Sequence, residues 1–366
     1  MPFTFYRISC SRLPLPVFYY INIILTIVTH TGHTPTDLSV LGNPVIPPIT
    51  PSNTFEQLAP AAGKYDYSRS GNYSRHVLEN CLAAIEGGYT ALTFASGLAA
   101  LGAVTQLLSS GDHVVAFDDL YGGTGRFFRK ISSKHGVIFD FVDMRDPNLF
   151  EAALTPKTKM VVLETPSNPL MRLVDIAEIS RVAHNYDKNI IVVVDNTLIT
   201  PYYQRPLELG ADLSLNSLTK YINGMIILCF IYSVKSFDRL YNHFDLVDIA
   251  RYRQNITLIY LISEKNLHFA SLGSDVPTFF SGHSDVVMGA VAVRKGLPDL
   301  VRALQFILFA AGAVPSVFDC YLCLRGVRTL AIRMQMHMRS ALTLATLPKK
   351  HPKVETVIHP GEHSIF

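Results

Sequence analysis

Lys220 is the side chain of this chain best suited to chemistry, because two hydroxyl side chains flank it in a short polar stretch. That stretch is NSLTKY at positions 216–221, with Ser217 and Thr219 beside the lysine. A free lysine amine has a pKa of about 10.4, so it acts as a nucleophile or proton carrier only where its surroundings lower that value. Hydroxyl groups are suited to holding a phosphate. The stretch therefore indicates a lysine that attacks a carbonyl compound carrying a phosphate.

Three further polar signatures precede the lysine, each after an apolar segment that we expect to be a strand. Asp195 follows the aliphatic run Ile190–Val194, where a carboxylate can keep a pyridine nitrogen protonated. Ser96-Gly97 begins a small-residue helix whose free backbone N–H groups suit a phosphate dianion. Tyr121 stands beside two glycines, where its ring can stack on a planar ligand. Together with a lysine that can form a Schiff base, these residue types indicate pyridoxal 5′-phosphate as the cofactor.

Each signature has a plainer structural reading when it is taken alone. Ser-x-Thr-Lys is common in surface loops, Asp-Asn-Thr after a strand is usually a helix cap or turn, and Ser-Gly after a strand is usually a turn. A single tyrosine such as Tyr121 is more often a core aromatic. The occurrence of all four signatures in this order along one chain favours the cofactor site.

Apolar strands and helices alternate from Tyr65 to Gly224, and these elements must position the polar residues. Aliphatic strands that are buried on both faces predict the α/β class, with a mainly parallel sheet wrapped by helices. Ligands of such sheets bind beyond the carboxyl ends of the strands, where the polar signatures fall. The expected strands are 89–94, 113–117, 138–142, 160–164 and 190–194. The expected helices are 98–108, 124–135, 147–154, 176–186 and 314–347, and a loop is expected at 212–216.

Composition excludes several other functions. The chain has 366 residues, a net charge of +3 and no dense basic cluster with interleaved aromatics, so we expect no nucleic-acid partner. Its five cysteines are scattered, which favours a reducing compartment, and we expect a cytoplasmic protein. Cys320-Tyr-Leu-Cys323 lacks a second ligand pair for zinc, so we expect two buried cysteines and no metal.

The N-terminal run Val17–Val28 is apolar and follows Arg7 and Arg12, which resembles a signal peptide. No small-x-small cleavage site follows it, and the run is too short to cross a membrane as a helix. We therefore expect no membrane association. Targeting and non-authentic coding sequence both stay open as explanations of this segment.

The motifs closely resemble those of the cysteine/methionine-metabolism family of pyridoxal-phosphate enzymes, which has fold type I. The resemblance covers roughly residues 43–224 and 282–361. The matching stretches are YSRSGN (67–72), ASGLAA (95–100), DDLYGGT (118–124), ETPSNP (164–169), VVDNT (193–197), TKYING (219–224) and GHSDVVMG (282–289). Two later stretches, GAVPS (312–316) and DCYLCLRGVRTLAIRM (319–334), resemble the cystathionine γ-lyase branch in particular.

The resemblance implies roles for individual residues. It implies Lys220 as the Schiff-base lysine, Asp195 as the pyridinium partner and Tyr121 as the stacking ring. Tyr67 and Arg69 would serve the site of a neighbouring subunit, so the resemblance implies a homo-oligomer, usually a dimer of dimers. The implied phosphate contacts are Ser96, Gly97, Leu98, Ser217 and Thr219, and the implied substrate contacts are Arg126 and Asn168.

The implied reaction is the α,γ-elimination of cystathionine to cysteine, 2-oxobutanoate and ammonia, a step of transsulfuration. A cystathionine γ-synthase or β-lyase is the alternative within the family, and a catalytically inactive product is the alternative outside it. Gly123 stands where methionine γ-lyases typically carry a cysteine, which counts against that branch.

The chain departs from the family pattern at three places. GHSDVVMG normally follows TKYxN directly, whereas residues 225–281 intervene here, including aliphatic runs at 225–234 and 256–263 without evident partner elements. We hypothesise that this segment is a retained intron translated in frame. The family continues past 360–361 into a small C-terminal domain that supplies an arginine for the substrate carboxylate, so that domain is expected to be largely missing. Residues 1–27 match nothing, and Tyr73 replaces a usual proline.

These patterns predict a division of the chain into six segments. They are a non-family segment at 1–27, an N-terminal arm at 28–64, a cofactor-binding α/β domain at 65–224, the insertion at 225–281, the continued α/β domain at 282–313, and linking helices at 314–366 that begin the small C-terminal domain.

Overall fold

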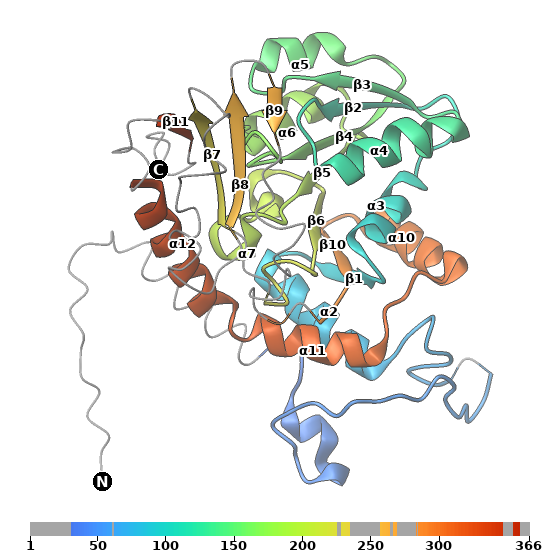
Figure 1. Ribbon diagram of the computed structural model, residues 1–366. Helices are drawn as coiled ribbons and strands as arrows, with labels where there is room; N and C mark the ends of the chain where they lie inside the picture. Colours follow the sequence, from blue (N-terminus) through green and yellow to red (C-terminus); the bar gives the residue numbers. More distant parts are fainter. Residues whose placement is uncertain are drawn as a thin grey trace.

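In the computed structural model, the largest part of the chain folds around one sheet. The described residues are 31–60, 62–224, 228–234, 257–263, 266–268, 283, 285–346 and 354–358. Seven strands among them form a sheet in the order β1-β10-β6-β5-β4-β2-β3 (Figure 1). They are β1 (Thr90–Phe94), β2 (His113–Phe117), β3 (Ile138–Val142), β4 (Thr158–Glu164), β5 (Ile191–Asp195), β6 (Leu213–Ser217) and β10 (Gly289–Val293).

Neighbouring strands of this sheet run parallel, except that β10 is antiparallel to both β1 and β6. The α/β class and the mainly parallel sheet expected from the sequence are therefore confirmed. Parallel pairing follows from the crossovers, because a helix returns the chain to the same edge between successive strands from β1 to β5.

Helices cover both faces of the sheet (Figure 1). They are α2 (Tyr73–Glu86), α3 (Gly97–Thr105), α4 (Gly122–Lys130), α5 (Pro147–Ala153), α6 (Ile176–Tyr186), α7 (Thr200–Tyr203), α10 (Pro298–Ala311), α11 (Val317–Val327) and α12 (Leu330–Thr346), with short 3-10 helices at Pro35–Leu41, Ser132–His135 and Pro206–Leu209. Val114 and Ala116 of β2 pack in the cluster that contains α3, α4 and α10. Val115 and Phe117 pack in a second cluster with α5 and α6. Because successive side chains of a strand point to opposite faces, these clusters lie on the two sides of the sheet.

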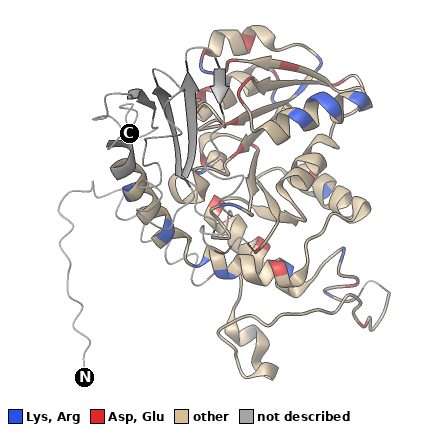
Figure 2. Cartoon of the chain, in the orientation of Figure 1, with Lys and Arg blue, Asp and Glu red and all other residues tan. Residues whose placement is uncertain are grey.

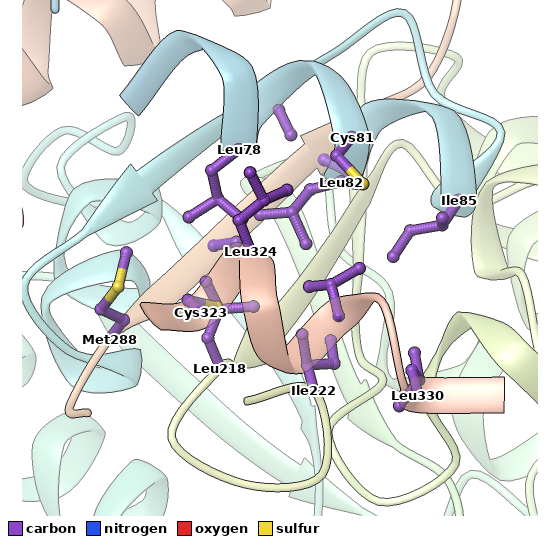
Figure 3. Close-up of a cluster of buried hydrophobic side chains, with 14 of the residues drawn as sticks. Leu78, Cys81, Leu82, Ile85, Leu218, Ile222, Met288, Cys323, Leu324 and Leu330 are labelled. Carbon is purple, nitrogen blue, oxygen red and sulfur yellow. The ribbon is translucent and has the colours of Figure 1, made fainter. Parts of the chain in front are cut away.

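A third apolar cluster joins the segment around Lys220 to α2, α11 and α12. Leu218 and Ile222, on either side of the lysine, are buried in it together with Leu324 of α11 and Leu330 of α12 (Figure 3). The lysine segment is therefore supported by helices that lie more than a hundred residues apart along the chain.

The CxxC pair lies in the same cluster. Cys320 and Cys323 are buried on α11 with free thiols, so the expectation of two buried cysteines is confirmed. Among the described residues, no group of three or more His, Cys, Asp and Glu side chains could hold a metal ion.

The expected loop at 212–216 is wrong, because Leu213–Ser217 is strand β6. Its leucines alternate with polar residues, and two of these, Ser214 and Asn216, are buried as well. Asn216 donates a hydrogen bond to the Glu86 carboxylate at 2.6 Å. A central strand whose polar side chains find buried partners resembles a loop when only the sequence is read.

A second sheet lies outside the main one and has the order β11-β7-β8-β9 (Figure 1). Its strands are β7 (Leu228–Val234), β8 (Thr257–Ser263), β9 (Asn266–His268) and β11 (Val354–Ile358). β7 and β8, the two aliphatic runs, pair in parallel, and β11 pairs antiparallel with β7. The expectation that these runs lack partner elements is therefore wrong, since their described residues pair with neighbouring strands of this sheet.

The residues that flank the segment 225–281 are in contact with each other. The Asn223 amide donates to Asp285 Oδ1 at 2.9 Å, and His283 Nδ1 lies 3.0 Å from the Asn223 carbonyl oxygen. No strand of the seven-stranded sheet comes from this segment. Apart from β7, β8 and β9, the segment 225–281 lies outside the described residues. Residues 1–27 and the apolar run Val17–Val28 also lie outside them. Among the helices that are described, none has the length and apolar character needed to span a membrane.

Candidate active site

The strand ends bring the polar signatures together at one edge of the main sheet. The register pairs Phe94 with Gly289 and Gly289 with Ser217 across β1, β10 and β6. Next along the sheet, Asp195 at the end of β5 pairs with Glu164 at the end of β4. The segments that follow these strands carry the expected cofactor residues, so they lie where parallel sheets bind ligands.

The start of α3 forms one side of this edge. Ser96 caps the helix, and its hydroxyl accepts the Ala99 N–H at 3.0 Å. The first backbone N–H groups of a helix have no acceptor within the helix, so those of Gly97 and Leu98 suit an anion. A methyl group on Gly97 would stand 3.0 Å from Ser217 Cβ. The absence of side-chain atoms at Gly97 thus lets the start of α3 lie against Ser217 of β6, which brings the free helix N–H groups close to the Ser217 hydroxyl.

Lys220 lies one turn after β6 on the same side. Its backbone N–H donates to the Ser217 carbonyl at 3.2 Å. Burial lowers the pKa of the Lys220 amine below its ordinary value, which favours the nucleophilic neutral form. The Thr219 hydroxyl accepts the Met288 N–H at 3.1 Å and lies 3.3 Å from the Met288 carbonyl. This threonine therefore also fixes the lysine segment to the start of β10.

Asp195 is held by a residue that the sequence analysis missed. Thr197 donates to Asp195 Oδ1 from its backbone at 3.0 Å and from its hydroxyl at 2.5 Å. The same hydroxyl accepts the Ser217 N–H at 2.8 Å. In the described part of the chain, no hydrogen bond engages Asp195 Oδ2, which leaves that oxygen for a ring nitrogen. Burial raises the pKa of Asp195, and a cationic ligand would offset that cost.

Glu164 is a second residue that sequence reasoning did not assign to the site. Its Oε2 accepts the Tyr121 N–H at 2.8 Å, so it fixes the start of α4. Burial, with the negative charge of Asp195 as the next cause, raises the pKa of Glu164 well above its ordinary value. Its signal in the sequence is its position at the end of a strand, within ETPSNP. Tyr121 is 47% exposed, so its ring is accessible to a ligand.

Asn168 lies in the loop after β4, next to Glu164 and Asp119. Its backbone N–H donates to Glu164. Asp119 accepts hydrogen bonds from the Ser167 hydroxyl and from the Leu170 N–H, the latter at 3.1 Å. This loop is therefore tied to the same edge as Tyr121, and the structure brings Asn168 to the site.

Three other expected residues lie apart from this group. Arg126 is exposed on α4, where Figure 2 shows several basic residues. The guanidinium of Arg69 lies over the rings of Tyr67, at 5.4 Å, and of Phe309 on α10, at 5.0 Å. Within the described residues, no hydrogen bond or cation–π contact joins Arg126, Tyr67 or Arg69 to Lys220.

The residues at this edge fit pyridoxal 5′-phosphate. A half-buried lysine with a lowered pKa suits the aldehyde, and an aspartate with one open oxygen suits the ring nitrogen. A helix start that lies against Ser217 suits the phosphate.

Comparisons with known proteins also point to a PLP-dependent enzyme. A family model described as Cys/Met metabolism PLP-dependent enzyme matches residues 26–233 and 273–365. Cystathionine γ-lyase of Rattus norvegicus is 40% identical over 91% of this chain and 68% of its own length. The human cystathionine γ-lyase is 39% identical over 91% of this chain and 67% of its own length. A probable cystathionine γ-synthase of Herpetosiphon aurantiacus is 40% identical over 91% of this chain and 84% of its own length.

Solved structures agree with the sequence relatives. The cystathionine γ-lyase from Lactobacillus plantarum complexed with L-serine matches with a TM-score of 0.71 and 31% identity, over 90% of this chain and 69% of that one. The metB structure from Corynebacterium glutamicum matches with a TM-score of 0.72 and 32% identity, over 91% of this chain and 70% of that one. This chain belongs to the Cys/Met metabolism family of PLP-dependent enzymes.

Proposed function

We propose that this chain is a cystathionine γ-lyase-like enzyme that releases cysteine from cystathionine by α,γ-elimination. With one water, cystathionine would give cysteine, 2-oxobutanoate and ammonia, which is a step of transsulfuration and cysteine biosynthesis. The observation that carries the proposal is the convergence of Lys220, Asp195 and the start of α3 at one sheet edge. The rat and human relatives that are named cystathionine γ-lyases support the choice of substrate.

The geometry of this edge supports several of the proposed cofactor contacts. Pyridoxal phosphate supplies an electron sink that stabilises a carbanion next to the amino group of the substrate. Asp195 would hold the ring nitrogen through Oδ2, and Thr197 keeps the carboxylate in place. Tyr121 would cover the ring. The proposed phosphate contacts are Ser96, Gly97, Leu98, Ser217 and Thr219, and Arg126 and Asn168 are proposed to contact the substrate.

Lys220 is proposed to carry the proton movements. Its lowered pKa gives more neutral amine near neutral pH than an exposed lysine has. The amine can take a proton from Cα of the substrate and then from Cβ, while the cysteine thiol leaves from Cγ. Burial thus prepares this side chain to act as both base and acid.

A second candidate is a cystathionine γ-synthase, which the Herpetosiphon relative favours because this chain covers 84% of its length. A β-lyase and an inactive product are the remaining alternatives. Product analysis separates all of these activities. Purified chain is loaded with pyridoxal phosphate and incubated with cystathionine, or with cysteine and an activated homoserine ester.

Cysteine with 2-oxobutanoate from cystathionine supports the γ-lyase, and homocysteine with pyruvate indicates a β-lyase. Cystathionine formed from the activated ester indicates a γ-synthase, and no product in either reaction indicates an inactive chain. Lys220→Ala should reduce any turnover to background, because no other described lysine lies at this edge.

We also propose that the chain forms a homo-oligomer, a dimer of dimers, in which Tyr67 and Arg69 serve a neighbouring site. Both side chains lie outward, and an arginine at such a position suits a phosphate oxyanion. Mixing Lys220→Ala with Arg69→Met should restore part of the activity that each variant lacks alone, because a mixed pair contains one intact site. We further propose the cytoplasm as the compartment, which the buried free thiols support.

A further inference from the structure

One arginine of α12 reaches the backbone directly after Lys220. Arg333 donates through Nη1 to the Tyr221 carbonyl and through Nη2 to the Ile222 carbonyl, at 3.2 Å. Nη2 also donates to the carbonyl of Gly326 in the last turn of α11, at 2.7 Å. A single guanidinium therefore joins the lysine segment, α11 and α12.

Arg333 is fixed from its own helix as well. Its Nε donates to the Thr329 hydroxyl at 3.0 Å, and that hydroxyl donates to the Gly326 carbonyl at 3.0 Å. No carboxylate pairs with Arg333 in the part of the chain that the structure describes. Burial lowers the pKa of Arg333 to about 10, so the group stays charged at neutral pH. The carbonyl groups at the end of a helix carry partial negative charge and can stabilise this cation.

The lysine segment also touches α11 directly. A methyl group at Gly326 would stand 2.1 Å from the Asn223 carbonyl oxygen, so only glycine allows this approach. The apolar side chains Leu218 and Ile222 lie buried beside Leu324 (Figure 3). The loop from Leu218 to Gly224 is thus packed by its side chains and held by Arg333 through its carbonyls.

A plainer explanation is that Arg333 only caps α11. The Gly326 carbonyl would be enough for that role, whereas two of its four hydrogen bonds go to the residues that follow Lys220. We propose that Arg333 is a positioning residue that sets the backbone of the Lys220 loop and thereby the place of the lysine amine relative to Asp195. This inference rests on the proposed role of Lys220.

The test compares Arg333→Met and Arg333→Lys with Arg294→Met in the full chain. Arg294 donates to the buried Asp212 carboxylate at the opposite end of β10 from Gly289, so its loss perturbs folding without touching the Lys220 loop. Two readouts are taken without cofactor. They are the hydrogen exchange of the peptide that spans 218–224 and the pH dependence of Lys220 acetylation by acetic anhydride, both measured by mass spectrometry.

In Arg333→Met, exchange of the loop amides should rise about tenfold to a hundredfold, because buried carbonyls lose their donor. The acetylation midpoint of Lys220 should move up toward the ordinary lysine value as the amine gains water, and the affinity for pyridoxal phosphate should fall by a similar factor. Arg333→Lys should lie between wild type and Arg333→Met, since an ammonium cannot reach all four acceptors. Arg294→Met should leave both loop readouts unchanged.

The inference would be overturned if Arg333→Met showed the hydrogen exchange and the acetylation of the wild type. It would also be overturned if Arg294→Met changed both readouts as much as Arg333→Met does. Should Arg333→Met fail to fold, Arg333→Lys decides the question, because wild-type behaviour of its loop would contradict a positioning role. Failure of the wild-type chain to bind pyridoxal phosphate at Lys220 would count against the proposed function instead. The two loop readouts stay separate from that result, since they need no cofactor.

Discussion

Thr197 is the residue that links the Asp195 carboxylate to the strand before Lys220. Its hydroxyl donates to Asp195 Oδ1 and accepts the Ser217 N–H. Thr197→Val removes both hydrogen bonds and keeps the shape, so we expect the affinity for pyridoxal phosphate to fall about tenfold. Thr197→Ser should retain most of it. Titration of the apoprotein measures both variants, and wild-type affinity in Thr197→Val would show that the link is not needed.

Glu86 links α2 to β6 through a carboxyl group that is 2% exposed. Burial raises its pKa from 4.5 to about 7. The folded state therefore binds more protons than the unfolded state between these values. The stability that this group contributes is fully present below pH 4.5, falls as the pH rises and is lost beyond about pH 7.

Glu86→Gln should remove this pH dependence, because an amide resembles the protonated carboxyl and has nothing to titrate. Relative to wild type, the variant should gain about 2–3 kcal/mol in unfolding free energy between pH 5 and pH 8. Urea unfolding at the two pH values measures the difference. The same pH dependence in Glu86→Gln and wild type would show that Glu86 titrates normally.

The start of α3 works as an anion site only if it can approach β6 and β10 closely. A methyl group on Gly97 would stand 3.0 Å from Ser217 Cβ, at the proposed phosphate site. Gly97→Ala is therefore expected to weaken binding of pyridoxal phosphate about tenfold or more, with little change in binding of the phosphate-free pyridoxal. Equal losses for the two ligands would indicate a general disturbance of α3 and would contradict the assignment.

The strand and helix pattern could be predicted where strands are continuous aliphatic runs, as in β2 and β4. α2 and α10 were not among the expected helices. α2 buries Leu78, Leu82 and Ile85 at helical spacing, so its signal was present in the sequence. α10 exposes Phe306 and Phe309 beside its buried residues, which obscures its apolar face. β6 was missed because its polar residues are buried with partners, a fact that depends on α2. The sequence pattern of a segment thus indicates whether its side chains are buried, but not which distant element covers them.

The same limit applies to the site. Lys220, Asp195 and Tyr121 could be predicted because their types and order are unusual in combination. Glu164 and Thr197 could not, since their roles come from the register between neighbouring strands and from contacts across β5 and β6. Arg333 lies more than a hundred residues from the lysine, and only the packing of α12 brings it there.

Residues 225–281 can be tested as a unit of the chain. We continue to propose that they are an insertion, since the family model leaves 234–272 unmatched and Asn223 already contacts Asp285. Joining Gly224 directly to Gly282 should keep or raise the melting temperature and preserve binding of pyridoxal phosphate, because no strand of the main sheet is removed. Loss of folding in this variant would contradict the proposal. Transcripts that all contain the segment would exclude a retained intron.

The place where pyridoxal phosphate attaches tests the central claim most directly. The wild-type chain is incubated with the cofactor, reduced with borohydride, digested and mapped by mass spectrometry. The geometry predicts one modified peptide, with the cofactor mass on Lys220, and no modification at that peptide in Lys220→Ala. A folded wild-type chain that carries the cofactor on another lysine, or on none, would contradict the assignment of this site.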